Sequence, residues 1–166
     1  MTETSCTVES PVGRLRLVAT EAGLARLEFA PRARKRPVPR GAAGVVLRSV
    51  ARQLKEYFEG KRRDFELPLD PGGAGFHRTV WDQLARIGFG ETICYAELAR
   101  RAGRPTAVRA AGAANGRNPL SIVLPCHRVV GRDGRLRGYG GGLRAKAWLL
   151  THEGVGVERG RVIGGP

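Results

Sequence analysis

A cysteine, a histidine and an arginine stand at consecutive positions, Cys126 to Arg128, within the otherwise apolar stretch IVLPCHRVV. The reactive form of cysteine is the thiolate, and a free thiol with a pKa of about 8.5 is only slightly ionised at neutral pH. His127 supplies a base of suitable pKa, and Arg128 supplies a field that favours the thiolate. Pro125 biases the preceding residue toward extended geometry and so fixes the direction of the chain at the thiol. These residues indicate an activated nucleophile, although many buried cysteines are inert small apolar residues.

A third group for this chemistry stands at the end of a predicted helix. The segment LRAKAWLLTHEG (143–154) has helical periodicity and ends in glycine. Its predicted buried face consists of Leu143, Ala147 and Leu150. Glu153 then lies at the negative end of the helix dipole, which costs roughly 0.3–1 kcal/mol unless a cation is near. Glu153 is therefore the candidate to orient His127, which completes a set of nucleophile, base and orienting group. Because the side chains of adjacent residues diverge, we expect the imidazole to reach the sulfur of Cys126 through a bridging water.

Two further helices are predicted upstream, in the segment YAELARRAGRPTAVRAAGAANGRN (95–118). Ala102 and Gly103 end the first helix, and Pro105 stands where the start of a helix tolerates proline. Two helices joined by a tight glycine-containing turn are typical of the helix-turn-helix motif of DNA-binding proteins, although a plain αα-hairpin has the same pattern.

In the second of these helices one arginine stands among small residues. The side chains expected to pack inward are Ala107, Ala110, Ala111 and Ala114. The opposite face is formed by Gly112, Ala113 and Gly116. Arg109 projects from that face, so the backbone could approach a duplex closely while a single side chain reaches into it. The alternative is an alanine-rich helix with a surface arginine.

The charge balance favours a polyanion as partner. Lysine and arginine number 29 against 15 aspartate and glutamate residues, which gives a formal net charge of +14. Residues 98–145 contain ten arginines and a single acid, Asp133. Arginine makes bidentate contacts with phosphates and base edges, although a genome that encodes arginine freely would produce the same excess.

The first half of the chain predicts strands and one helix. Alternating apolar and polar residues within residues 7–29 indicate two strands with a turn at 21–23. Their inward residues are Leu15 and Leu17 in the first strand, and Leu24, Leu27 and Phe29 in the second. Residues 31–40 (PRARKRPVPR) predict an exposed loop, which is either a solvated arm or a phosphate contact. Residues 44–58 predict an amphipathic helix. Its apolar face consists of Val46, Val50, Leu54, Tyr57 and Phe58.

A linker separates the two halves. Residues 64–76 predict a short strand that runs into a proline- and glycine-rich connection, and a helix is predicted over residues 77–90. The buried face of that helix consists of Val80, Trp81, Leu84 and Ile87. We therefore predict an N-terminal α/β domain over residues 1–72 and a C-terminal helix-turn-helix catalytic domain over residues 73–166.

The cysteines indicate a reducing compartment. Three cysteines do not form a disulfide framework, and no CxxC pair suggests a zinc ribbon. We find no signal peptide and no apolar run of about 18 residues, so we expect a soluble protein with no membrane partner.

The residues PCHRV (125–129) resemble the active-site motif of the O6-alkylguanine-DNA alkyltransferases, the methylated-DNA–protein-cysteine methyltransferases. The resemblance continues with matching order and spacing over residues 80–154, from VWDQLARIGFG to WLLTHEG. The stretches SPVGRLRLVAT and EAGLARLEF are similar to the α/β domain of that family. The resemblance implies an α/β (α+β) fold, in which a small ribonuclease-H-like domain precedes a mainly helical winged helix-turn-helix domain.

The resemblance also implies a repair reaction with a single turnover. O6-alkylguanine, and also O4-alkylthymine, is flipped out of the duplex from the minor groove, and its alkyl group moves irreversibly to a cysteine of the protein. The base must leave the stack because the target atom is inaccessible within it.

The family's functional residues map onto this chain one by one. Cys126 is the acceptor, His127 is its water-mediated base, and Glu153 orients the histidine. Asn118 braces the turn, and Tyr95 donates a hydrogen bond toward the guanine ring as negative charge develops there.

The resemblance assigns the remaining residues to the base pocket and to DNA. The main chain of Val129 reads the guanine edge, and the pocket wall is formed by Pro125, Tyr139 and Gly140. Arg109 fills the gap left by the flipped nucleotide, and the small residues that suit the minor groove are Gly112 and Ala113. Arg128 is expected among the DNA contacts. The implied partner is double-stranded DNA carrying O6-alkylguanine, bound by a monomer that clusters cooperatively, in the cytoplasm and nucleoid of a bacterium. No cofactor is expected.

Two positions depart from familiar members of the family, and the zinc site of some relatives is not expected here. Gly140 replaces a serine near the alkylated oxygen, so a backbone N–H must serve there and larger alkyl groups could enter. Cys94 stands where serine is usual, and we expect it to be a packed small residue rather than a second acceptor. Cys6 and His77 are too few ligands for the zinc site of some relatives, so no metal is expected.

Three other functions fit part of the pattern. A damage-sensing alkyltransferase-like protein would grip lesions without transfer, but such relatives replace the cysteine. A DNA-binding regulator with a sensing cysteine would require an effector segment that we do not identify. A Cys/His hydrolase would give no reason for the basic helix pair.

Overall fold

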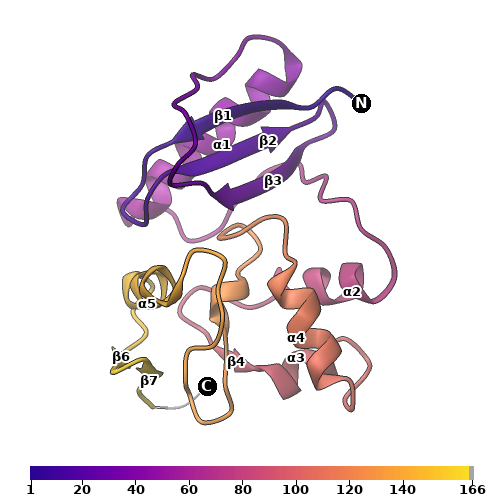
Figure 1. Cartoon of the computed structure of the whole chain (residues 1–166), viewed down its shortest axis with the longest axis vertical. Helices are drawn as coiled ribbons and strands as arrows, with labels where there is room; N and C mark the ends of the chain where they lie inside the picture. Colours follow the sequence, from indigo (N-terminus) through magenta and orange to yellow (C-terminus); the bar gives the residue numbers. More distant parts are fainter. Residues whose placement is uncertain (165–166) are drawn as a thin grey trace. The chain divides into compact units, whose positions relative to one another are not determined.

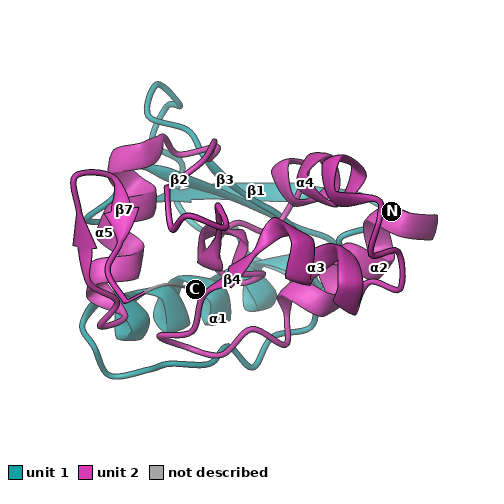
Figure 2. Cartoon of the chain, turned by 90° about the horizontal axis from the view of Figure 1, so that it is seen from below, with its two compact units in different colours: residues 1–72 teal, residues 73–166 magenta. Residues whose placement is uncertain are grey.

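The computed structural model describes residues 1–164, and the chain divides into two compact units, Met1–Gly72 and Gly73–Pro166 (Figure 2). Strands and a helix share the first unit, and helices dominate the second. The mixed α/β fold class predicted from the sequence is therefore confirmed. Within the described residues, no helix combines the length and the apolar character that a membrane crossing requires.

The first unit is a three-stranded antiparallel sheet with one helix. Its elements are β1 (Thr4–Val8), β2 (Leu15–Ala19), β3 (Leu24–Phe29) and α1 (Ala42–Phe58). The strands are ordered β1-β2-β3, and α1 contacts all three and covers one face of the sheet (Figure 1). The two predicted strands are β2 and β3, and Leu15, Leu17 and Leu27 are fully buried in them. Alternation predicts these strands because only one face of the sheet is covered by α1.

Two details of the first unit differ from the prediction. The strand β1 was not predicted, because its residues TSCTV contain only two apolar side chains. On α1, Leu47 is fully buried, whereas Val46 is only half-buried. The register of the helix face is therefore rotated by one residue at its start, while Val50, Leu54 and Tyr57 are buried as expected.

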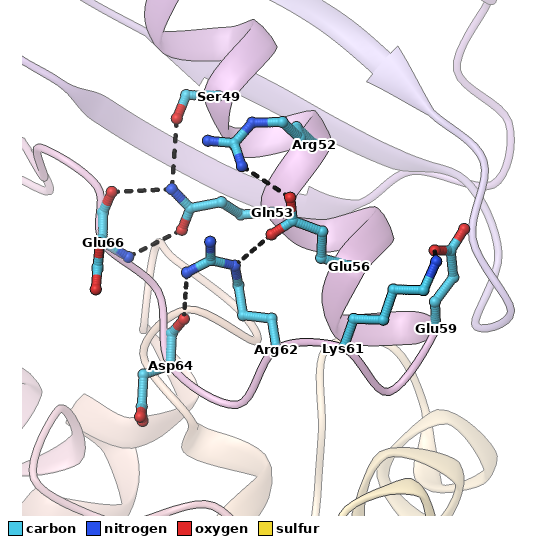
Figure 3. A network of polar contacts seen from close by, with 9 residues as sticks. All are labelled: Ser49, Arg52, Gln53, Glu56, Glu59, Lys61, Arg62, Asp64 and Glu66. Atoms are coloured by element: carbon cyan, nitrogen blue, oxygen red, sulfur yellow. Dashed lines mark hydrogen bonds and ion pairs between the residues drawn. The ribbon is translucent and has the colours of Figure 1, made fainter.

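The predicted strand at the start of residues 64–76 is also wrong. Only Leu69 forms an isolated bridge there, to Leu24. Glu66 pairs instead with a side chain of α1 (Figure 3): Gln53 Nε2 donates to the Glu66 carbonyl at 2.9 Å, and the Glu66 N–H donates to Gln53 Oε1 at 2.9 Å. A glutamine amide thus satisfies the backbone groups that a neighbouring strand would otherwise bind.

The second unit contains a helical core, a short parallel ladder and a C-terminal hairpin (Figure 1). Its helices are α2 (Gly75–Leu84), α3 (Tyr95–Arg101), α4 (Val108–Gly116), the 3₁₀ turn η1 (Cys126–Arg128) and α5 (Leu143–His152). Its strands are β4 (Ile93–Cys94), β5 (Val129–Val130), β6 (Val157–Glu158) and β7 (Arg161–Val162). Helices α2, α3 and α4 pack against one another, and β4 pairs in parallel with β5.

The helix-turn-helix prediction corresponds to α3 and α4. Gly103, with φ of 80°, follows the end of α3 and adopts the left-handed conformation that favours glycine. The helix α4 begins at Val108 rather than near Pro105. Ala110 was predicted to pack inward but is exposed, whereas Asn115 is buried. The inward stripe of α4 is therefore narrow, with Ala111 and Ala114 at its centre, and Trp81 Nε1 of α2 donates to the Ala114 carbonyl at 2.9 Å.

Two other helices differ from the prediction, one in the residue at which it ends and the other in the face that is buried. The helix predicted over residues 77–90 is α2 and ends at Leu84, but all four of its predicted apolar side chains are buried. In α5, Leu143 was predicted to be buried but is 50% exposed. Lys146 is fully buried in its place, so the inward face of α5 is rotated relative to the prediction.

Candidate active site

The cysteine of the PCHR segment lies in η1, directly before β5. The side chain of Asn118 holds the loop that leads to this turn: Oδ1 accepts from the Leu120 N–H at 2.9 Å, and Nδ2 donates to the Leu124 carbonyl at 2.7 Å. The Cys126 N–H donates to the same Leu124 carbonyl at 2.8 Å. Asn118 follows α4 by two residues, so the thiol-bearing turn is tied to the end of the helix-turn-helix.

Ile122, within the same loop, has φ of 74° and is almost completely buried. A β-branched residue rarely adopts this left-handed conformation, which costs about 1–3 kcal/mol. Such strain persists only where surrounding contacts determine the backbone. The path of the loop toward Cys126 is therefore fixed by its packing and by Asn118.

His127, Arg128 and Glu153 form a buried network. His127 Nε2 lies 2.7 Å from Glu153 Oε1. Arg128 donates from Nε to Glu153 Oε2 at 2.8 Å and from Nη2 to Oε1 at 2.9 Å, and its Nη1 donates to the carbonyl of Ile87. Both carboxylate oxygens are therefore occupied, and Arg128 is the cation that offsets the charge at the end of α5.

The environment of this network sets its protonation. Burial alone would raise the pKa of Glu153, but hydrogen bonds from His127 and Arg128 outweigh burial and hold that pKa well below its usual range. Burial lowers the pKa of His127 even though Glu153 opposes the shift, so the imidazole is neutral at pH 7. A neutral ring that donates from Nε2 to Glu153 has a lone pair at Nδ1. That Nδ1 is buried and has no hydrogen-bond partner within residues 1–164.

Cys126 is a buried thiol that is protonated at rest. It is 6% exposed, and burial raises its pKa, while a hydrogen bond from Asn118 and the charge of Lys146 act in the opposite direction. A neutral base beside a protonated thiol can accept its proton when a substrate arrives. Within residues 1–164, no hydrogen bond joins the thiol of Cys126 to Nδ1 of His127.

Lys146 is the functional candidate that the sequence analysis missed. Its side chain is fully buried, its Nζ donates to the Arg137 carbonyl at 3.0 Å, and Nζ lies 6.0 Å from the centre of the Tyr95 ring. Burial lowers its pKa to about 8, an effect that the nearby Cys126 opposes. One signal could have identified it: Lys146 is one of four lysines in an arginine-rich chain, and lysine rather than arginine can adjust its pKa when buried.

Two tyrosines lie close to these groups. Tyr95 is the first residue of α3, and burial raises its pKa, with a further increase from the charge on Cys126. The ring of Tyr139 lies 6.4 Å from the ring of His127, in an edge-on arrangement. A Cβ added at Gly140 would meet no atom within 4 Å, so the position beside Tyr139 is open. Val129 and Pro125 are both buried on either side of η1.

The outward face of α4 adjoins this site. Arg109, Ala113 and Gly116 are exposed on it, and Gly112 is half-buried. A Cβ at Gly112 would lie 3.6 Å from the ring of Tyr95, so the small-residue face begins where the candidate site ends.

The structure corrects the role expected of Arg128. Its side chain is 6% exposed and bound to Glu153 and Ile87, so it is not available to contact DNA. The cation that lowers the pKa of Cys126 is Lys146, not Arg128. Adjacency in sequence suggested the arginine, but its side chain extends away to the end of α5.

The remaining expected residues lie apart from this chemistry. Cys94 is half-buried at the start of α3, and Cys6 is fully buried in β1, where burial raises its pKa to about 11. Among the residues that the structure describes, no group of three or more His, Cys, Asp or Glu side chains is arranged to hold a metal ion.

Two protein-family models match the chain. The model described as "6-O-methylguanine DNA methyltransferase, DNA binding domain" matches residues 75–155. The model described as "6-O-methylguanine DNA methyltransferase, ribonuclease-like domain" matches residues 5–71. The two matches meet at the junction of the two compact units and together span most of the chain.

Curated relatives and solved structures agree with these matches. The chain is 44% identical over 148 residues to the methylated-DNA--protein-cysteine methyltransferase of Methanosarcina barkeri, covering 88% of this chain and 94% of the relative. The protein of the same name from Mycolicibacterium paratuberculosis is 43% identical over 153 residues, covering 89% and 90%. The crystal structure of Mycobacterium tuberculosis O6-methylguanine methyltransferase has a TM-score of 0.80 and 38% identity, covering 92% of this chain and 93% of that chain. The structure of Mycobacterium tuberculosis OGT in complex with DNA has a TM-score of 0.78 and 40% identity, covering 89% and 90%.

Proposed function

The chain belongs to the 6-O-methylguanine DNA methyltransferase family, and from this membership we propose that it repairs DNA by moving the alkyl group of O6-alkylguanine to its own Cys126. The transfer is irreversible and occurs once per molecule. The single observation that supports this assignment most is the buried set of thiol, neutral imidazole and carboxylate at Cys126, His127 and Glu153.

The reaction follows from the protonation states of these groups. The proton of the Cys126 thiol passes through a bridging water to Nδ1 of His127, and Glu153 stabilises the imidazolium that forms. The sulfur attacks the alkyl carbon, the bond from that carbon to O6 breaks, and its electron pair passes to the purine. The purine takes up one proton, which balances the proton lost by Cys126, and so becomes guanine. The new thioether has no leaving group, so the reaction ends after one transfer.

Lys146 and Tyr95 stabilise the charges of this step. The ammonium of Lys146 favours the thiolate electrostatically, since the two groups each shift the other's pKa toward the charged form. The Tyr95 hydroxyl donates a hydrogen bond toward the purine as negative charge develops on it. Val129 meets the guanine edge through its main chain, and Pro125, Tyr139 and Gly140 wall the pocket.

Access to the base requires the duplex to be opened. The face of α4 with Gly112 and Ala113 enters the minor groove, and Arg109 occupies the space of the extruded nucleotide.

Double-stranded DNA is the partner, and the damaged base is O6-alkylguanine or O4-alkylthymine. The protein acts as a monomer that clusters on DNA. The N-terminal unit (1–72) is the α/β domain, and the C-terminal unit (73–166) is the helix-turn-helix catalytic domain. The site of action is the cytoplasm, at the nucleoid, as bacterial relatives suggest.

The assignment is tested with duplex DNA that carries one labelled O6-methylguanine. The wild-type chain should acquire at most one equivalent of label, and the label should remain on the protein after denaturation. The Cys126→Ala and Cys126→Ser variants should acquire none. Label on either variant at the wild-type rate would contradict Cys126 as the acceptor, while repeated release of methyl product would indicate a turnover enzyme instead.

A further inference from the structure

An arginine-lined groove of about 810 Å³ lies in the second unit, between the β6–β7 hairpin and the segment that follows β5. Its lining consists of residues 135–137 and 158–161. Four of these seven residues are arginines: Arg135, Arg137, Arg159 and Arg161. The transfer chemistry assigns no role to these four guanidinium groups.

The walls of the groove are held in place by backbone pairing. The Leu136 N–H donates to the Gly160 carbonyl at 2.9 Å, and the Val162 N–H donates to the Gly134 carbonyl at 2.8 Å. These bonds hold the segment around residue 135 against the edge of the two-stranded hairpin, where Arg135 forms an isolated antiparallel bridge with Arg161. The apolar cluster beneath it consists of Val130, Leu136, Leu150 and Val162. The arginines therefore project from a surface that is held by backbone hydrogen bonds and packed on an apolar cluster.

The groove carries more positive charge than its own carboxylates neutralise. Asp133 is shared: its Oδ2 lies 3.5 Å from Nε of Arg135 and 4.0 Å from Nη2 of Arg137. Arg159 and Arg161 make no ion pair within the described part of the chain, and both are exposed. Since Glu158 is the only carboxylate in the lining itself, the groove has a surplus of cations that an anion would stabilise.

The conformation of Arg159 is a second and independent observation. Arg159 has φ of 50° and Gly160 has φ of 72°, the positive values at both central positions that a tight β-hairpin turn requires. Asparagine, aspartate and glycine are preferred at the first of these positions, and an arginine there is strained. The turn alone would favour a different residue, so the geometry of the turn does not explain the arginine at this position.

One of the two segments that line the groove follows the candidate active site in the chain. The strand β5 follows Cys126 and runs directly into the segment that carries Arg135 and Arg137. The Arg137 carbonyl accepts the hydrogen bond from Lys146, and the Arg137 guanidinium lowers the pKa of Tyr95 against the effect of burial. One edge of the groove is therefore within electrostatic reach of the base pocket.

We propose that this arginine groove binds backbone phosphates of the damaged duplex, as an anchor separate from the outward face of α4. The inference rests on the proposed function, because a duplex must be present for its backbone to be held beside the extruded nucleotide. Four guanidinium groups that line one groove can bind several phosphates through bidentate hydrogen bonds, whereas a single small anion would contact only one or two of them.

The test uses the full chain with the double substitution Arg159→Asn and Arg161→Gln. Binding to a duplex with one O6-methylguanine, and to the undamaged duplex of the same sequence, is measured over a range of salt concentrations. Each phosphate contact contributes about 0.9 to the slope of log affinity against log salt, so we expect the slope to fall by about 1 to 2 units. Affinity at physiological salt should fall about tenfold or more on both duplexes, because phosphates carry no sequence information.

Two controls separate binding from folding and from net charge. The single variant Arg159→Asn introduces a residue type that favours this hairpin turn. The Tm of the variant should therefore equal or exceed that of the wild type, while the affinity of the variant for DNA falls. The variant Lys55→Gln with Lys61→Gln removes the same charge from exposed positions of the first unit and should leave the salt slope near the wild-type value.

An unchanged slope in the groove variant, or an equal decrease of the slope in the lysine variant, would overturn the groove as a phosphate site. Methyl transfer to the wild type is recorded in the same samples. Failure of that transfer would overturn the proposed function and is distinguishable, because the comparison of salt slopes does not depend on transfer.

Discussion

At the scale of single residues, burial shifts the pKa values of Cys126 and Lys146 in opposite directions. Burial raises the pKa of the thiol and lowers that of the ammonium to about 8, so burial favours the neutral form of both groups. The charge of each group opposes that effect in the other. Thiolate formation is therefore coupled to a charged Lys146, which assists the transfer of the proton from Cys126 to His127.

Lys146→Met tests this coupling, because methionine resembles lysine in length but has no charge. We expect the single-turnover rate of methyl transfer from duplex DNA to fall by about tenfold to a hundredfold, the size of effect typical for the loss of one charge-stabilising group. The Tm should stay equal or rise, because the variant no longer buries a cation. A rate within twofold of the wild type would exclude the electrostatic role.

The pH dependence of stability tests the neutral state of His127. Its folded pKa is lowered, so below its ordinary value of 6.5 the unfolded chain binds a proton that the folded chain does not. The free energy of unfolding should therefore fall as pH decreases from 7 to 5, by up to about 1.4 kcal/mol per pH unit for one proton. Below about pH 4.5, Glu153 adds to the loss, because its folded pKa is also lowered.

The variant His127→Gln should flatten this dependence between pH 7 and pH 5. Denaturant unfolding at fixed pH values measures it, and Cys126→Ala, which keeps the histidine, should retain the wild-type slope. The same steepness in the His127→Gln variant would show that other groups cause the acid sensitivity.

At the scale of helices and strands, α4 presents one long cation among small residues beside Tyr95. Arg109→Ala should therefore weaken repair of a lesion in duplex DNA by at least about tenfold, while the rate with free O6-methylguanine base falls much less. Single-turnover assays with the two substrates measure the difference. Equal losses with both would remove the proposed role of Arg109 in base extrusion.

Among the helices and strands, the sequence predicted where most elements occur but not which contacts between elements they make. Periodicity predicted α5 but not its rotation, because Lys146 interrupts an apolar pattern and long lysine stems pack well among apolar side chains. The predicted strand near Glu66 failed because the amide of Gln53 satisfies its backbone, a contact between residues 13 apart. The motif from Cys126 to Arg128 and the carboxylate of Glu153 at the end of α5 could be identified from the sequence, because both depend on local sequence alone.

At the scale of the whole molecule, the division into two units could be read from the Pro/Gly linker, whereas the burial of Arg128 could not. That burial depends on Glu153 and Ile87, which approach from 25 residues after it and 41 residues before it in the chain. The sequence therefore predicted which residues gather around Cys126 better than it predicted which of them face solvent.

Alkylation should change the stability of the entire chain. Cys126 is 6% exposed, and a methyl group added to a packed interior costs about 1–3 kcal/mol. For a chain of this size, that cost corresponds to a decrease in Tm of about 2–12 °C. Calorimetry before and after reaction with one equivalent of methylated duplex measures it. An alkylated protein as stable as the unreacted one would show that the pocket holds space for the product.

The concealment of the sulfur at rest has a consequence for chemoselectivity. Oxidants, stray electrophiles and small disulfides in the surrounding medium meet a shielded, protonated group with little inherent reactivity. A reagent that can act only once would be consumed uselessly if it responded to every such encounter. Because the thiol is buried and protonated at rest, it reacts when the damaged base is bound in the site, and the presence of an alkylating agent in solution is not sufficient.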